Sequence, residues 1–130
     1  MKGKVMPTLL ENQKAIMSQL EAGEFVKGME EYYADDAINE EADGTQVVGK
    51  ANIIANEHKI LEQVAAFHGC TTRSVGADDD GNGNGTTFAE YELRVDMKDG
   101  STFNPKQVQV TRWEDGKAKH IQFYYDPAKL

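Results

Sequence analysis

The sequence is nearly free of cysteine and has no long apolar run, and each absence excludes a class of protein. Cys70 is the single cysteine, so the chain can form no internal disulfide, which fits a reducing compartment. No apolar run approaches the ~20 residues of a membrane-spanning helix. No apolar segment follows the initial MKGK, so the sequence predicts no signal peptide. We therefore expect a cytoplasmic protein without a membrane span.

Basic side chains are also scarce. Lys and Arg number 14 against 22 Asp and Glu, which gives a formal net charge of −8. Binding to a phosphate backbone depends on clustered Lys and Arg, and an anionic lipid surface attracts the same residues. The charge balance therefore predicts no nucleic-acid partner and no membrane-surface partner.

Motifs for cofactors and metals are missing as well. The sequence contains no P-loop, no dinucleotide-binding fingerprint and no serine triad, and its three histidines lack metal-ligand spacing. The segment DDDGNGNG, residues 78–85, begins like a calcium loop, but the position that requires a bidentate Glu falls on Ala89. We interpret this segment as a hairpin tip and expect neither a cofactor nor a metal.

At 130 residues the chain has the size of one domain, which we assign to 1–130. Thr8 and Glu11 form a capping-box pattern at the start of an amphipathic segment that ends at Gly23. The apolar spacing predicts helices at 8–23, 24–33 and 50–67, with a short strand at 37–41 between the second and third.

The remainder alternates like strands. We predict strands at 69–77, 86–97, 103–113 and 118–126, with Asp-Gly turns at 99–100 and 115–116. One face of the second of these strands carries Ala89, Tyr91, Leu93, Val95 and Met97. The pattern indicates an α+β domain with helices on one face of an antiparallel sheet.

Three stretches, YYADDA, VVGKANI and VQVTRWEDGKAKHIQFYYDP, lie in an order that resembles the nuclear-transport-factor-2-like superfamily, in particular its SnoaL-like (polyketide cyclase) and ketosteroid-isomerase-like branches. The resemblance implies a cystatin-like cone, in which three N-terminal helices pack on a curved, mainly antiparallel sheet around an apolar pocket. It also implies a homodimer that forms through the outer face of the sheet. Members of this superfamily differ in chemistry, so the fold does not fix the function.

The resemblance also assigns site residues. The general base of the isomerase pattern falls on Glu41, and the acid that holds the enolate oxygen falls on Gln109. The oxyanion tyrosine falls on Ile16 or Met17, neither of which can donate a proton. Steroid isomerisation is therefore not expected. Tyr33 matches a tyrosine that lines the pocket.

Two glutamates gain support from their spacing. Glu41 shares a strand face with Ala37 and Asn39, so it either faces the pocket or points to water at the strand end. Glu57 lies within the apolar stripe of the third helix, formed by Ile53, Ile60, Leu61 and Val64. A carboxylate on such a stripe needs a partner, a proton or a cavity. Glu57 therefore faces the pocket, or reaches out to a partner such as Arg73.

Gln109 alternates with Gln107, Thr111 and Trp113, while Val108 and Val110 take the opposite face. Either the glutamines face the pocket and hydrogen-bond there, or the valines face the core and the glutamines meet water or a partner. His120 is either a proton shuttle or an exposed sheet residue.

These patterns predict a small-molecule pocket protein, as a cofactor-free acid/base enzyme of the isomerase, cyclase or dehydratase type that acts on a small apolar ligand. The alternative is a non-catalytic ligand-binding or dimeric assembly domain. The catalytic candidates are Glu41, Glu57 and Gln109. The substrate-binding candidates are Tyr33, Asn39, Ile53, Tyr91, Thr111, His120 and Phe123.

Overall fold

The computed structural model describes residues 7–129, so residues 1–4, on which the prediction of no signal peptide partly rests, lie outside it. The elements follow in the order α1 (Leu9–Glu21), α2 (Lys27–Tyr32), β1 (Tyr33–Glu40), β2 (Gln46–Val48), α3 (Lys50–Glu62), β3 (Val64–Asp79), β4 (Gly85–Met97), β5 (Thr102–Phe103), β6 (Lys106–Glu114), β7 (Lys117–Tyr124) and a final 3-10 turn, Pro127–Lys129. No helix in the described range is long and apolar enough to cross a membrane.

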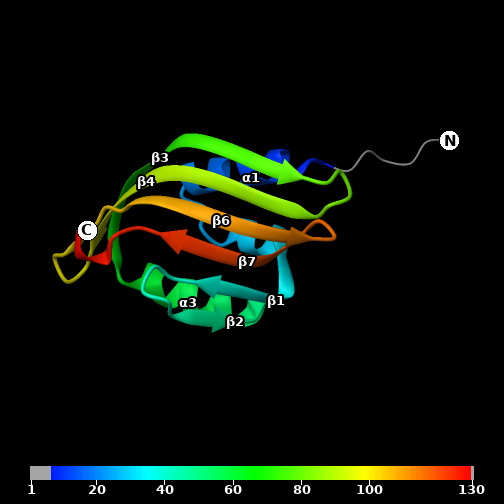
Figure 1. The fold of residues 1–130 in the computed structure, drawn as a ribbon. Coiled ribbons are helices and arrows are strands. Elements are labelled where there is room, and N and C mark those ends of the chain that lie inside the picture. The colour runs from blue at the N-terminus through cyan, green and yellow to red at the C-terminus, as the bar shows by residue number, and fades with distance from the viewer. Residues whose placement is uncertain (1–6, 130) are drawn as a thin grey trace.

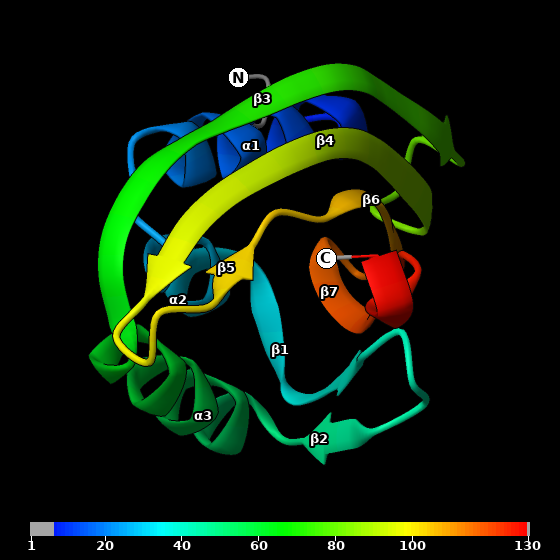
Figure 2. The same ribbon diagram turned by 90° about the vertical axis from the view of Figure 1, so that its left-hand side faces the viewer.

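One curved sheet joins all the strands, in the order β2-β1-β7-β6-β4-β3, with β5 paired to β4 (Figure 1). Every neighbouring pair is antiparallel except β1 and β7, which run parallel. Seen from its end, the sheet curls around the helices: α1 lies beneath the arch of β3 and β4, and α3 lies near β1 (Figure 2). The concave face of the sheet and the helices therefore surround a common interior.

The curvature has a local cause in the longest hairpin. β3 and β4 pair over 13 register positions, and the register shifts at three places along β3. Each such bulge inserts a residue into one strand, which bends that strand and increases its twist. The hairpin can therefore wrap over α1 instead of lying flat.

The first helix presents its apolar stripe to this arch. Its start is fixed by the predicted capping box: the Thr8 hydroxyl accepts from the Glu11 N–H at 3.1 Å, and the Glu11 carboxylate accepts from the Thr8 N–H at 3.1 Å. Leu9, Gln13, Ile16 and Met17 are the buried residues of α1. A glutamine thus lies among the apolar residues that face the sheet.

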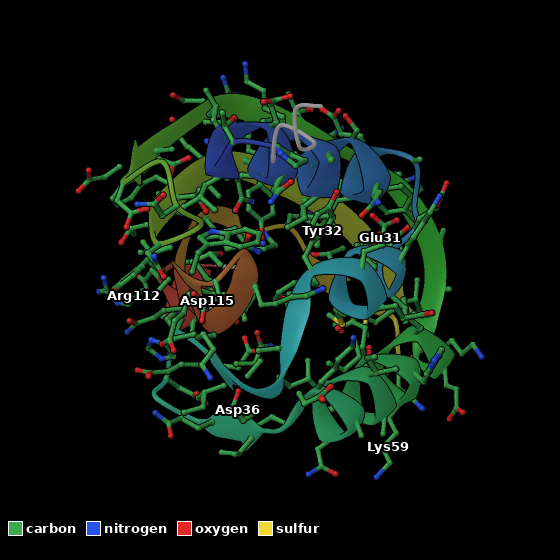
Figure 3. The ribbon with its side chains drawn as sticks, turned by 90° about the vertical axis from the view of Figure 1, so that its right-hand side faces the viewer. Glu31, Tyr32, Asp36, Lys59, Arg112 and Asp115 are labelled. Atoms are coloured by element: carbon green, nitrogen blue, oxygen red, sulfur yellow. The ribbon has the colours of Figure 1, made fainter. Side chains whose placement is uncertain are left out.

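The narrow end of the molecule is closed by aromatic side chains. Tyr32, labelled in Figure 3, packs edge-on against Trp113 with ring centroids 6.1 Å apart. The charged side chains labelled in Figure 3 are exposed: Glu31, Asp36, Lys59, Arg112 and Asp115. The four carboxylates of the acidic region 30–36, Glu30, Glu31, Asp35 and Asp36, are all exposed, and the last two lie in β1.

The α+β class and the curved, mainly antiparallel sheet are confirmed, but the description as three N-terminal helices is not. Only α1 and α2 precede the sheet, α2 is a short helix of 6 residues, and α3 follows β1 and β2. The expected helix 50–67 ends at Glu62, because Val64–Asp79 pairs along its length with β4. Pairing across the sheet overrides the local helical pattern of 63–67.

Candidate functional site

A cavity of about 610 Å³ lies between the concave face of the sheet and the three helices. Its wall is mostly apolar and aromatic, with a few polar side chains from β1, α3, β4 and β6. This is the composition typical of a small-molecule site. The apolar wall is formed by Ile16, Leu20, Phe25, Met29, Ile60, Leu61, Val64, Leu93, Val95, Met97, Phe103 and Phe123.

β5, the β1–β2 loop and the C-terminal turn lie at the end of the molecule that faces the viewer in Figure 2, and each contributes residues to the cavity lining. Lining residues from these segments, Asp43, Thr45, Ser101, Thr102 and Pro127, are exposed. At the same rim, the rings of Phe103 and Tyr125 meet edge-on with centroids 6.0 Å apart. The opposite end is the one closed by Tyr32 and Trp113.

Glu41 follows directly after β1 and lines the cavity. Its backbone closes a tight turn, since the Glu41 N–H donates to the Thr45 carbonyl at 2.9 Å and the Glu41 carbonyl accepts from Gly44 at 2.9 Å. Gly44 has a φ of +88°, a conformation that glycine adopts without strain. Burial raises the pKa of the Glu41 carboxyl above its ordinary value, and the nearby Asp43 charge adds to the rise.

Glu57 reaches the cavity from the inner face of α3. Burial raises the pKa of the Glu57 carboxyl to about 7, and the charge of Glu41 contributes in the same direction. Within residues 7–129 neither glutamate makes an ion pair, and Arg73 instead pairs with Glu92 at 3.0 Å. Glu57 is therefore close to half protonated at neutral pH, which is the condition for both taking and giving a proton.

A buried polar chain connects the core to the cavity wall. The Trp113 indole N–H donates to the Thr87 hydroxyl at 2.8 Å, and that hydroxyl donates to the Gln13 side-chain oxygen at 2.6 Å. The Gln13 amide then donates to the Gln109 side-chain oxygen at 3.0 Å. An indole nitrogen can only donate, so it fixes the direction of every later bond. The Gln109 amide N–H groups are thereby left to donate towards the cavity.

The next acceptor is the Tyr91 phenol. Burial raises the pKa of Tyr91 well above its ordinary value, so the hydroxyl stays protonated. A hydrogen bond with the Gln109 side chain acts in the opposite direction, as expected when the phenol oxygen accepts. The Tyr91 O–H can then donate to a bound molecule. Burial likewise raises the pKa of Tyr33, which also lines the cavity.

Asn39 supplies an acceptor without a partner. Its side chain is 6% exposed and lines the cavity, and its side-chain oxygen has no hydrogen-bond partner in the described structure. A buried carbonyl oxygen without a donor costs about 1–3 kcal/mol. A bound donor group would remove that cost.

Seven of the ten residues singled out in the sequence line the cavity: Glu41, Glu57, Gln109, Tyr33, Asn39, Tyr91 and Phe123. The remaining three do not. Ile53 is 2% exposed and packs in the hydrophobic core, and Thr111 is 2% exposed with its hydroxyl 3.5 Å from the Gln109 oxygen. Both lie behind the wall.

His120, a substrate-binding candidate that could also have been an exposed sheet residue, does not line the cavity. Its ring nitrogen lies 3.1 Å from the Glu40 carboxylate, away from the cavity. A register shift in the β6–β7 pairing makes Trp113 oppose Ala118 and Arg112 oppose His120, so one extra residue enters β7. Ala118 and Ile121, three residues apart, are therefore both buried, which a regular strand would not allow.

The sequence reasoning missed the role of Gln13. Gln13 is fully buried and holds both Thr87 and Gln109. A glutamine between apolar residues at helical spacing was the available signal, the same one that identified Glu57.

Within residues 7–129, no group of three or more His, Cys, Asp or Glu side chains is placed to hold a metal ion.

Solved structures share this architecture, although no protein-family model and no curated protein sequence matches the chain. A candidate SnoaL-like polyketide cyclase from Mesorhizobium loti is 22% identical, with a TM-score of 0.78 over 92% of this chain and 100% of that chain. An NTF2-like protein of unknown function from Burkholderia pseudomallei is 18% identical, with a TM-score of 0.75 over 95% of each chain.

A third similar structure, from Catenulispora acidiphila, is a protein with a ketosteroid isomerase-like fold in complex with trimethylamine. It is 15% identical, with a TM-score of 0.68 over 95% of this chain and 91% of that chain. The chain therefore has the nuclear-transport-factor-2-like fold. Its structural neighbours are NTF2-like, SnoaL-like and ketosteroid-isomerase-like proteins, as the sequence resemblance predicted.

Proposed function

We propose that the protein is a cofactor-free enzyme that moves a proton on a small, largely apolar molecule, in a reaction of the isomerase, cyclase or dehydratase type. The observation that carries this proposal is Glu57, a buried carboxyl group with a pKa of about 7 on the wall of a 610 Å³ cavity. A general acid/base works best when its pKa lies near the working pH.

Glu57 is the proton carrier in this proposal. The sequence resemblance assigned the general base to Glu41. Burial raises the pKa of both carboxyl groups, but only for Glu57 does the rise bring the pKa to about 7. Burial is the main cause of the raised pKa of Glu57, and the charge of Glu41 adds to it. Two carboxyl groups whose environments separate their pKa values supply a donor and an acceptor together.

Gln109 and Tyr91 orient and polarise the substrate. The chain of bonds from Trp113 leaves their N–H and O–H groups as donors towards the cavity. They replace the oxyanion tyrosine of the isomerase pattern, whose position falls on the apolar Ile16 or Met17. Preorganised donors of this kind stabilise charge that develops during a reaction.

The test is deuterium uptake from D₂O into a panel of small carbon acids, both neutral ketones and cationic pyridinium salts, followed by proton NMR. We expect at least one member to exchange faster with the wild type than with Glu57→Gln. Glu62→Gln, at an exposed position of the same helix, is the matched control and should behave like the wild type. A panel without any Glu57-dependent exchange would favour the alternative, a non-catalytic ligand-binding domain.

A further inference from the structure

The charge of the cavity wall has one sign. The titratable carboxylates that line it are Glu24, Glu41, Asp43 and Glu57, and the described lining includes no Lys, Arg or His. Only Glu24 has a cation nearby, the exposed Lys27 at 3.3 Å. A cleft with charges of one sign and low-dielectric walls concentrates its potential, and here the whole chain adds to it with a net charge of −8. An anionic ligand would meet repulsion throughout this cavity.

Aromatic rings occupy much of the same wall. Phe25, Tyr33, Tyr91, Phe103, Phe123 and Tyr125 all line the cavity. The face of an aromatic ring attracts a cation, and enclosure by several rings is the usual way to hold an organic ammonium group. An apolar ligand without charge would also suit the rings, but it would leave the two glutamates without a counterion.

The unpartnered Asn39 oxygen separates these alternatives. Asn39 lies on β1, two residues before Glu41, and its buried oxygen accepts no hydrogen bond in the described structure. Gln19, which also lines the cavity, has a buried side-chain oxygen in the same condition. Acceptors without donors, on a wall that also carries carboxylates without cations, suit a ligand that donates hydrogen bonds and carries positive charge.

We propose that the ligand is an organic cation of the protonated-amine class, with its ammonium group beside Glu41, Glu57 and Asn39 and its apolar body against the aromatic wall. This rests on the proposed function, because it takes the cavity to be the ligand site.

The negative charge of the cavity wall also favours one kind of proton-transfer reaction over another. Removal of a proton from the carbon next to a protonated C=N group breaks the C–H bond, passes the proton to a carboxylate and leaves the electron pair as a C=C bond. The nitrogen becomes neutral, so the product is an uncharged enamine. The equivalent step next to a C=O group creates an enolate anion; Gln109 and Tyr91 can donate to its oxygen, but the carboxylates Glu41 and Glu57 repel its charge. A cationic nitrogen substrate therefore suits the site better than a ketone.

Benzyltrimethylammonium and its uncharged carbon isostere, neopentylbenzene, test the charge alone. Their binding to the full chain can be followed by chemical-shift changes in ¹⁵N-labelled protein. We expect the cation to bind at least about tenfold more tightly than the isostere, which corresponds to about 1.4 kcal/mol, because the cation is attracted by the carboxylate charges of the cavity wall and the isostere is not. Glu57→Gln should remove most of this preference, and the exposed Glu62→Gln should retain it.

The dependence of binding on pH adds an independent readout, since neither probe titrates. Below pH 7 the Glu57 carboxyl is protonated, and a bound cation must displace that proton. Affinity for the cation should therefore rise as the pH increases to about 7 and then level off, while affinity for the isostere stays constant. Glu41 and the protonated Tyr33 are the titratable groups that share the electrostatic environment of Glu57.

Equal affinity for the two probes, or a preference that survives Glu57→Gln, would overturn the amine proposal and leave the cavity as a site for neutral molecules. Absence of binding by both probes would overturn the amine proposal and also count against a ligand site in the cavity. Deuterium exchange into a neutral ketone alone would retain the enzyme and exclude the amine.

Discussion

Glu57 combines two properties that usually exclude one another: it is ionisable, and its carboxyl group is largely withdrawn from water, on a partly buried residue that makes no ion pair in the described structure. Its folded-state pKa of about 7 lies above the ordinary value of 4.5. Between these two values the folded state binds more protons than the unfolded state. The free energy of unfolding therefore falls as the pH rises from 4.5 to 7 and is constant outside this window, as far as Glu57 determines it.

We therefore expect Glu57→Gln to stabilise the protein at pH 8 and to have little effect at pH 4.5. A pKa displaced from 4.5 to about 7 corresponds to roughly 3 kcal/mol at pH 8. Urea denaturation at both pH values measures this, with Glu62→Gln as the control. A difference between wild type and variant that is the same at pH 4.5 and pH 8 would show that Glu57 is not perturbed.

Thr87 is the central link of the buried polar chain. Thr87→Val keeps the side-chain shape but leaves the Trp113 N–H and the Gln13 oxygen without partners, at about 1–3 kcal/mol for each group. We expect a loss of roughly 3 kcal/mol in urea denaturation and a shift of the Trp113 fluorescence.

Thr111→Val is the matched control for Thr87→Val. It removes a hydroxyl that is equally buried but makes only a 3.5 Å contact. We expect its loss of stability to be about 1 kcal/mol or less, because a contact of that length is a weak hydrogen bond. Equal losses for the two variants would contradict a structural role for the chain.

Residues identified from the sequence were those whose position followed from a regular period. Glu57 was recognisable because it broke an otherwise apolar helical stripe. Alternation along β6 placed Gln107 and Gln109 on one face, but it left open whether that face or the valine face was buried. His120 could not be placed correctly, because its face depends on a single inserted residue in β7. The partner of Gln109 could not be named, because Gln13 lies 96 residues away in sequence.

At the scale of elements, α1 carries the clearest local signal in the chain. Both bonds of its capping box form as the sequence predicted, at the exposed Thr8 and Glu11. The end of α3 and the start of β1 could not be predicted from local sequence, because both depend on pairing with strands that lie far away in sequence. Tyr33, predicted at a helix end, is the first residue of β1 and opposes Ala118.

The capping box gives a prediction of its own. Thr8→Ala removes the acceptor for the Glu11 N–H, so we expect the free energy of unfolding to fall by about 1 kcal/mol. Ser18→Ala, at an exposed interior position of α1, is the control and should be neutral or slightly stabilising. Chemical denaturation resolves the two, and an equally small effect at both positions would mean that the helix start is held by packing alone.

For the whole molecule, the face of the sheet opposite the helices remains partly apolar. Phe88 and Tyr124 are 44% and 49% exposed, and Val108 and Val110 on β6 lie between their strands. Antiparallel sheets of this size bury one face and leave the other to water or to a partner. The superfamily resemblance makes a second copy of the chain the expected partner.

We predict a homodimer through this face, measurable by light scattering at micromolar concentration. Val110→Glu, in the middle of the face, should convert it to a monomer, because a charge there would be buried without a partner. Lys98→Glu, in the exposed turn after β4, changes charge elsewhere and should leave the dimer intact. A monomeric wild type would count decisively against the prediction.

The parallel pairing of β1 with β7 also governs how the chain reaches this structure. Glu40 and His120, which meet across that pairing, are 80 residues apart in sequence. Closing so long a loop is entropically unfavourable, and pairing of distant strands slows folding. β1 and β2 can join the rest of the sheet only after β7 has formed, because β1 pairs with β7. Until then Glu41 and Gln109 do not line a common cavity. The hairpin of β3 and β4, whose partners are close in sequence, can form first and hold α1 under its arch. Binding competence should therefore appear in the final kinetic phase of refolding, after most of the secondary structure.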